Sequence, residues 1–155
     1  MKKIAYLIPV LLLFIINACE IDNSGCTDPD AINFDGSAEV ESNNCKYEGR
    51  LTLWYAEAST DLFSEYNIHS LRFYVNNELI DSTSSTLFFT SAPLCEAELA
   101  VSTTQDLDQL KEKDFTIKVV DEEEDIVWEY SIEFIANACK VFELKEKDMY
   151  PYLVN

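Results

Sequence analysis

Apolar and polar residues alternate with a period of two through much of the chain after residue 50. The alternation covers four runs, at residues 51–56, 71–76, 115–120 and 126–134. In the last run every second residue is apolar or aromatic: Ile126, Trp128, Tyr130, Ile132 and Phe134. Because successive side chains of a β-strand point to opposite faces, such runs predict strands with one buried and one exposed face. Strands of this kind form antiparallel sheets that cover a core with one side.

Turn residues between the runs predict how these strands connect. Asn76 and Asn77 separate two apolar runs and predict a tight hairpin. The acidic residues 121–125 separate the last two long runs in the same way. Shorter strands are expected at residues 87–90, 98–103 and 141–144, and one helical turn at residues 105–113. About seven short strands predict a mainly β fold, an antiparallel Ig-like β-sandwich over residues 50–145. A tail at residues 146–155 either frays or adds to a sheet edge.

The first 18 residues predict an export signal rather than part of a folded domain. Lys2 and Lys3 precede an apolar stretch at residues 4–16, which is the order found in a secretory signal peptide. The stretch is about 13 residues long, shorter than the roughly 20 residues of a membrane-spanning helix. Residues 1–18 are therefore predicted to be removed from the mature protein.

The export signal ends on a sequence that resembles a lipobox. Ile16, Asn17, Ala18 and Cys19 place an aliphatic residue three positions before the cut, a small residue just before it and a cysteine just after it. The resemblance implies a bacterial lipoprotein whose Cys19 carries palmitate-type acyl chains that insert into a bilayer. Residues 19–24 would then be a lipidated tether. The alternative is an ordinary signal peptide whose Cys19 forms a disulfide.

Acidic residues follow Cys19 directly and bear on where the anchored protein resides. Glu20 and Asp22 resemble the export signal of surface-exposed lipoproteins in the Bacteroidetes. The resemblance implies an outer-membrane anchor with the domain at the cell surface. The alternative is that the anchored protein stays in the periplasm.

Five cysteines in an exported chain raise the question of disulfides. If Cys19 carries lipid, the other four form an even set, which suits an oxidising compartment. Three pairings are open, and we favour Cys26 with Cys45 and Cys95 with Cys139, because each pair bounds a coherent segment. The rival is a zinc site, which the lack of a CxxC pair and the single histidine disfavour.

Residues 25–47, called the stapled segment below, are rich in turn residues and contain Cys26 and Cys45. The segment resembles a short motif of many secreted and surface proteins of Bacteroidetes, which runs GCTDP, Ala, Asn, an aromatic residue, Ala, Cys and Tyr. The matching residues are Gly25, Cys26, Thr27, Asp28, Pro29, Ala31, Asn33, Phe34, Ala38, Cys45 and Tyr47. Phe34 replaces the commoner tyrosine, and residues 41–44 replace the usual Asp-Asp-Gly-Ser. The resemblance implies a small disulfide module in a surface protein and does not imply an enzyme.

The region after Cys95 carries a second, looser resemblance. Small β-sandwich domains of Bacteroidetes lipoproteins have a strand pair with a tryptophan, followed by a cysteine and a last alternating strand. Trp128, Cys139, Phe142 and Leu144 carry the likeness here. The resemblance implies that Cys139 stands just before the last strand of the sandwich.

Two groups of residues are candidates for binding a ligand. Asp28, Asp30, Asn33 and Asp35 offer the oxygen atoms that calcium prefers, although their spacing is not that of an EF-hand. The alternative is that Asp28 and Asn33 cap turns through nearby backbone groups. Trp54 and Tyr74 lie on the polar phase of their strands and are candidates for a glycan platform. The alternative is that these aromatic residues belong to the core.

Charge and composition narrow the classes of function. The chain has 29 acidic and 11 basic residues, for a formal net charge of −18. Such a field repels phosphate backbones, so nucleic acid is excluded as a partner. His69 is the single histidine, and the chain has neither a GxSxG motif nor a glycine-rich phosphate loop. The acidic residues 121–125 are a candidate for calcium or a carboxylate pair, with a solvated hairpin tip as the alternative.

These features predict a non-catalytic, membrane-anchored lipoprotein that presents a β-sandwich for interaction at the cell surface. Its expected partners are the lipid bilayer, through Cys19, and an unknown protein or glycan. The alternatives are a glycan- or calcium-binding accessory module and an inhibitor of a secreted enzyme. A hydrolase using two carboxylates is a third class, for which a chain of 155 residues offers little material. Calcium is the one cofactor considered.

Overall fold

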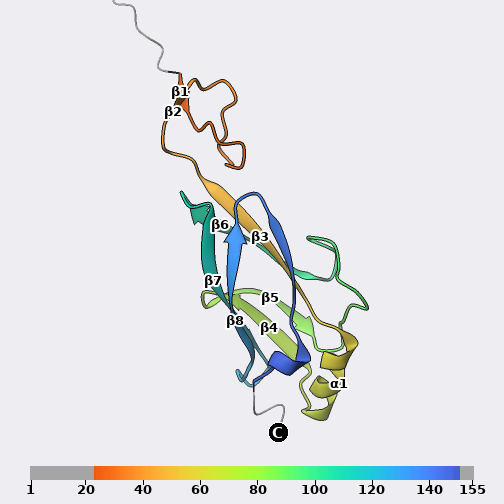
Figure 1. Cartoon of the computed structure of the whole chain (residues 1–155). Helices are drawn as coiled ribbons and strands as arrows, with labels where there is room; N and C mark the ends of the chain where they lie inside the picture. Colours follow the sequence, from red (N-terminus) through yellow and green to blue (C-terminus); the bar gives the residue numbers. More distant parts are fainter. Residues whose placement is uncertain (1–22, 151–155) are drawn as a thin grey trace, which may run out of the picture.

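The computed structural model describes residues 23–150, and β-strands dominate this part of the chain (Figure 1). Strands account for 46% of the residues and helices for 9%. Two sheets pack face to face as a sandwich-like fold, which confirms the mainly β prediction. The predicted signal peptide, Cys19 and residues 151–155 lie outside the described residues.

One sheet has three strands. In it, β3 (Tyr47–Trp54) lies between β6 (Val101–Asp108) and β9 (Cys139–Glu143). The pair β3–β6 is antiparallel, but β3 and β9 run parallel. The expectation of an entirely antiparallel sandwich is therefore wrong at this pair. A hairpin forces its two strands to run antiparallel, whereas β9 reaches its sheet from β8 in the other sheet, and no hairpin fixes its direction.

The other sheet has four strands in the order β5, β4, β7, β8, and every neighbouring pair is antiparallel. The strands are β4 (Ser70–Val75), β5 (Glu78–Ser84), β7 (Glu112–Val120) and β8 (Ile126–Ile135). Asn76 and Asn77 form the β4–β5 turn as predicted, with φ of 47° and 69°. Asparagine tolerates this left-handed conformation better than most residues do.

The core lies between the sheets and contains the apolar phase of the predicted runs. Its members include Leu51, Leu53, Leu71, Phe73, Ile117, Val119, Trp128, Ile132 and Phe134, each at most 2% exposed. Trp128 lies at one end of this core, with ring centroids 5.6 Å from Phe63 and 5.9 Å from Tyr55. Its indole N–H donates to the carbonyl of Lys145 at 2.9 Å, so the buried polar atom has a partner.

Two local predictions are wrong, and one helix was not predicted. Helix α1 (Glu57–Glu65) was not predicted, because its sequence is polar on most sides and only Ser59 and Phe63 are buried. Residues 87–90 form no strand. The expected helical turn at residues 105–113 is instead the end of β6, a short turn and the start of β7. Pairing with β3 and burial of Leu107 outweigh the local polar pattern there.

The stapled segment lies at the end of the sandwich remote from α1 (Figure 1). It contains two short parallel strands, β1 (Ser24–Gly25) and β2 (Val40–Glu41), and its last residue, Tyr47, begins β3. The disulfides Cys26–Cys45 and Cys95–Cys139 are both formed, which confirms the favoured pairing. The second disulfide joins the loop before β6 to the first residue of β9.

The described part of the predicted tail packs on the sandwich. The 3-10 helix η1 (Glu146–Asp148) leads to Met149, which is buried. The backbone N–H of Tyr150 donates to the carbonyl of Val127 in β8 at 3.0 Å. Residues 146–150 therefore pack against the sandwich.

Candidate functional site

Asp28, the first residue of the candidate calcium set, is engaged by three neighbours. Its Oδ1 accepts from the backbone N–H of Asp30 at 3.1 Å, and its Oδ2 accepts from the hydroxyl of Tyr47 at 2.8 Å. The Nζ of Lys111 lies 2.6 Å from the same Oδ2. The hydrogen bond from Lys111, followed by those from Asp30 and Tyr47, lowers the pKa of Asp28 below its ordinary value. These contacts balance the negative charge of the Asp28 carboxylate and satisfy its oxygens without a metal ion.

Two other members of the set, Asn33 and Asp35, form hydrogen bonds with backbone groups, whereas the Asp30 carboxylate pairs with Lys111. Asn33 donates to the carbonyl of Asn44 at 3.0 Å and accepts from the N–H of Lys46 at 2.8 Å, so it joins the two halves of the stapled segment. Asp35 accepts from the N–H and the hydroxyl of Ser37. The local bond from Asp30 agrees with turn capping by Asp28, whereas Asn33 binds backbone groups 11 and 13 residues away. Neither arrangement supports a calcium site.

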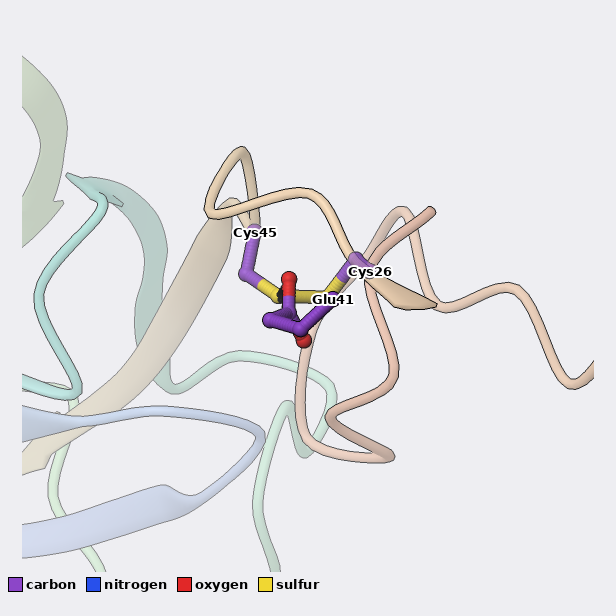
Figure 2. A group of neighbouring side chains, drawn as sticks. All are labelled: Cys26, Glu41 and Cys45. Atoms are coloured by element: carbon purple, nitrogen blue, oxygen red, sulfur yellow. Dashed lines mark hydrogen bonds between the residues drawn. A yellow bond between two sulfur atoms is a disulfide. The ribbon is translucent and has the colours of Figure 1, made fainter. Parts of the chain in front are cut away.

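One group of potential metal ligands does come together in the described part of the chain. Cys26, Glu41 and Cys45 are the only His, Cys, Asp or Glu residues there that gather three or more ligand atoms within 4.8 Å of one another. Figure 2 shows the Glu41 carboxylate beside the disulfide that joins the two cysteines. A metal-binding cysteine acts as a thiolate, and in this disulfide both sulfur atoms are bonded to each other.

Glu41 is itself held by hydrogen bonds within the segment. One of its oxygens accepts from the N–H of Thr27 at 2.9 Å and from the hydroxyl of Thr27 at 2.6 Å, and the other accepts from the N–H of Asn43 at 2.9 Å. The bonds from Thr27 come first among the causes that lower the pKa of Glu41. Sequence reasoning overlooked Glu41, because it lies where the chain departs from the motif. Beside the disulfide, Glu41 joins Thr27 to Asn43 through hydrogen bonds, which is a structural role rather than that of a metal ligand.

The two aromatic candidates for a glycan platform do not share a surface. Trp54 lies on β3 and Tyr74 on β4, in different sheets. Their chain neighbours Leu53 and Phe73 are buried between the sheets, so Trp54 and Tyr74 face outward from opposite sides of the sandwich. Both are half-buried, and Lys118 Nζ lies 5.4 Å from the ring centroid of Tyr74. A single sugar cannot stack on both rings.

The acidic residues 121–125 support the hairpin between β7 and β8. Asp121 Oδ1 accepts from the N–H groups of Glu123 and Asp125, each at 2.9 Å, and Glu124 forms an ion pair with Arg72. Asp121 and Glu124 thus have different partners. The arrangement agrees with the hairpin-tip alternative rather than with a shared metal ion or a carboxylate pair.

His69 lies next to this hairpin and is exposed. Its backbone N–H and that of Ser70 donate to the carboxylate of Glu122 at 3.1 and 3.2 Å. Burial alone would raise the pKa of Glu122, but the backbone hydrogen bonds outweigh it and lower the pKa. The backbone of His69, and not its imidazole ring, therefore makes the contact with Glu122. This contact gives the imidazole no catalytic partner.

The structure reveals one contact that sequence reasoning missed, at the turn between β6 and β7. Lys111 in this turn pairs with Asp28 and also with Asp30, at 3.4 Å, and its Nζ lies 5.8 Å from the ring centroid of Tyr47. Gln109 donates to the carbonyl of Asn43 at 3.5 Å. The turn thus contacts the stapled segment on two sides. More than 60 residues separate these partners along the chain, and a single sequence carries no signal for so distant a contact.

Helices in the described region are few and short, and none of them is long and apolar enough to cross a membrane.

Comparisons of the chain with protein-family models, with curated proteins and with solved structures find no match.

Proposed function

We propose that the chain is an exported, non-catalytic lipoprotein, anchored in the outer membrane through Cys19, that presents its β-sandwich for interaction at the cell surface. The observation that carries the proposal is the use of the cysteines. The four cysteines in the described residues form two disulfides, and the fifth stands at the end of a signal-peptide pattern in a lipobox-like sequence. Disulfides persist in oxidising compartments, so the two disulfides support export of the chain. Export is in turn what a lipid anchor at Cys19 requires.

The charge of the chain and the place of the stapled segment support presentation away from the membrane. Loss of residues 1–18 leaves 29 acidic side chains against 9 basic ones, since Lys2 and Lys3 are removed from the 11. This charge repels anionic lipid and favours solubility. The stapled segment lies between Cys19 and the sandwich along the chain, and it contacts the β6–β7 turn through Lys111. It is suited to hold the sandwich off the bilayer.

A role without catalysis is supported by what the titratable candidates do. Asp28, Glu41 and Asp121 accept hydrogen bonds that stabilise turns, and Glu122 accepts from two backbone N–H groups. The glycan and calcium alternatives gain no support, because Trp54 and Tyr74 face apart and the candidate calcium ligands already bind Lys111, Tyr47 or backbone groups. An inhibitor of a secreted enzyme remains compatible with presentation of the domain, and it would act through the same exposed surfaces.

The anchor is tested by labelling with an alkyne-bearing palmitate analogue in a bacterium that lipidates exported proteins. The full chain should incorporate the label and sediment with membranes, and Cys19→Ser, the matched control, should do neither. Intact mass should rise by two hydrogens for each of the two disulfides on reduction. Unlabelled full chain, or label retained in Cys19→Ser, would overturn the anchor.

Surface exposure is tested on whole cells. External protease should digest the sandwich of the native protein while the outer membrane is intact. Replacing Glu20 and Asp22 with alanine should protect it, because those acidic residues form the proposed surface signal. Equal protection of both forms would place the domain in the periplasm and overturn presentation at the surface.

A further inference from the structure

Strand β5 is an edge of the four-stranded sheet, and both of its faces are largely open. It pairs with β4 on one side, and no strand of the described chain lies on its other side. Five of its seven residues are exposed and two are half-buried. A β-bulge at Ile80 interrupts the register near the hairpin, but residues 81–84 face residues 70–73 in regular order. An edge strand presents unpaired N–H and C=O groups that another chain can pair with.

Some backbone groups of the other long edges have partners from elsewhere in the chain. In β8, the carbonyl of Val127 accepts from the N–H of Tyr150 and that of Glu133 accepts from Lys140 Nζ. In β6, the carbonyl of Asp106 accepts from Lys113 Nζ. The β9 edge lies against β8 through the rings of Phe142 and Tyr130, whose centroids are 5.0 Å apart.

The β5 edge has little protection of this kind. Among the described residues, the carbonyl of Ser84, at the very end of β5, accepts from Leu87 and Tyr55. Within the strand, the N–H of Ser82 donates to the side chain of Asp81. In the described chain, no other backbone group of β5 has a hydrogen-bond partner outside the pairing with β4. The stretch from the bulge to Ser84 is therefore an open edge of the sandwich, and it is the one that lies beside a hollow lined by β5 residues.

A hollow of about 480 Å³ lies beside this edge, between residues 81–84 of β5 and the loop at residues 85–100. Leu87 and Leu99 from the loop line it. Leu99 is 66% exposed with φ of 70°, an uncommon conformation for a leucine. The side chain of Leu99 is thus held in solvent by its backbone conformation. An apolar group of a ligand that bound in the hollow would cover it.

The wall of the hollow is fixed in place by the second disulfide. Cys95 in the loop is bonded to Cys139 in β9. The next residue, Glu96, donates its N–H to the hydroxyl of Thr52 at 2.9 Å and pairs its carboxylate with Arg50 at 3.3 Å. Thr52 is fully buried on the outer side of its sheet because this loop covers it. A preorganised wall lowers the entropic cost of binding.

From this geometry we infer that the open edge of β5 binds an extended, basic peptide segment of a protein partner by strand addition. The backbone of the segment pairs with residues 81–84, and an apolar side chain enters the hollow between Leu87 and Leu99. A lysine or arginine two residues along lies on the same face and meets Asp81, which is exposed. A formal net charge of −18 favours a basic partner.

The same charges disfavour a second copy of this chain as the occupant. Pairing of two β5 strands would bring Glu78 and Asp81 of one copy close to those of the other, and like charges across a strand pair destabilise it. The inference rests on the proposed role in presenting the domain for interaction and names the chemistry of the partner.

The test uses the full, ¹⁵N-labelled chain in detergent and follows amide chemical shifts. The probe is an end-blocked six-residue peptide of threonine with valine at its third position and lysine at its fifth, which places both side chains on one face of the strand. The matched peptide has glutamate in place of lysine. The basic peptide should shift amides of residues 81–87 and 99–100, and the acidic peptide should not. Asp81→Lys should weaken binding about tenfold through like-charge repulsion.

The control variant is Glu133→Lys, which makes the same change of charge on β8, at the opposite edge of the same sheet. Glu133 is also exposed, and its reversal should weaken binding less than about threefold, since screening limits the reach of a distant charge. Leu99→Ser should weaken peptide binding without changing the amide shifts of β8, the opposite edge of the sheet.

Several outcomes would overturn the inference. Equal effects of the two charge reversals, or shifts scattered over the surface, would mean general attraction of a cation to an acidic protein. Shifts of β5 amides with protein concentration alone would make a second copy the occupant. If millimolar peptide shifts no amides, the β5 edge does not bind such a peptide. None of these readouts depends on lipid at Cys19, so failure here is distinguishable from failure of the palmitate labelling.

Discussion

The stapled segment and the sandwich hold their shapes by different means. The segment buries few apolar groups and leaves Ile32, Phe34 and Val40 each 48–58% exposed. A disulfide and side-chain hydrogen bonds to backbone hold it together. The sandwich buries a much larger set of apolar side chains between two sheets, and Cys26, Ala31 and Cys45 are the segment's own contribution to the same cluster, besides Tyr47, which begins β3. A segment of this size cannot stabilise itself by apolar burial, so covalent and polar contacts replace it.

The largest expected effect is on the sandwich, from Trp128→Ala. Trp128 is fully buried and packs against Phe63 and Tyr55, so its removal should cost about 3–5 kcal/mol of unfolding free energy. Chemical denaturation followed by circular dichroism measures this loss. The control is Trp54→Ala, a half-buried tryptophan on an outer face, which should cost clearly less. Equal losses would contradict the placement of the core.

The second expected effect is confined to the stapled segment. Replacing Cys26 and Cys45 together with serine should destabilise the segment by about 3 kcal/mol on the chain-entropy model. Hydrogen exchange should then quicken for amides between them, while the denaturation midpoint of the sandwich stays unchanged. A midpoint that falls by a matching amount would show that the two regions unfold as one unit.

A smaller effect is expected where the two regions meet. Lys111→Met removes the ion pairs with Asp28 and Asp30 but keeps an apolar stem over Tyr47. Exposed ion pairs contribute little to global stability, so the denaturation midpoint should hardly move. Hydrogen exchange should still quicken in the stapled segment. Lys147→Met in η1 is the control. If it quickens hydrogen exchange in the stapled segment as much as Lys111→Met does, Lys111 has no specific role.

The smallest and most selective effect is expected from acid. In the described residues four carboxyl groups have lowered pKa values, and three of them, Asp28, Asp35 and Glu41, lie in the stapled segment. The hydrogen bonds from Lys111, Ser37 and Thr27 respectively are the leading causes.

A carboxyl whose pKa is lowered by folding stabilises the fold above the pKa of the unfolded group and loses that contribution as pH falls through the lowered value. From about pH 4 downward, the stapled segment should therefore loosen before the sandwich does. Amide shifts recorded between pH 5 and pH 2 measure the order of the two transitions. Asp28→Asn should blunt the response, and simultaneous loosening of both regions would contradict this assignment.

Much of the fold follows from local patterns. The two-residue period identified the buried side of four strands, and Asn76 and Asn77 identified the hairpin because few residues accept a positive φ. The cysteine pairing was favoured because each pair bounds a segment, and both disulfides form. The candidate ligand residues were identified by type alone. Residue type does not decide whether an oxygen faces a metal ion or a backbone N–H.

The sequence by itself determined which face of each long strand is buried, because that depends on the order of neighbouring side chains. Only the tertiary structure decided that β3 and β9 run parallel, that Lys111 contacts the stapled segment and that β5 is left as an open edge. It also decided that α1 forms, since Phe63 packs against Tyr55 and Trp128. These features arise from contacts between residues far apart in the chain, and local periodicity does not encode them.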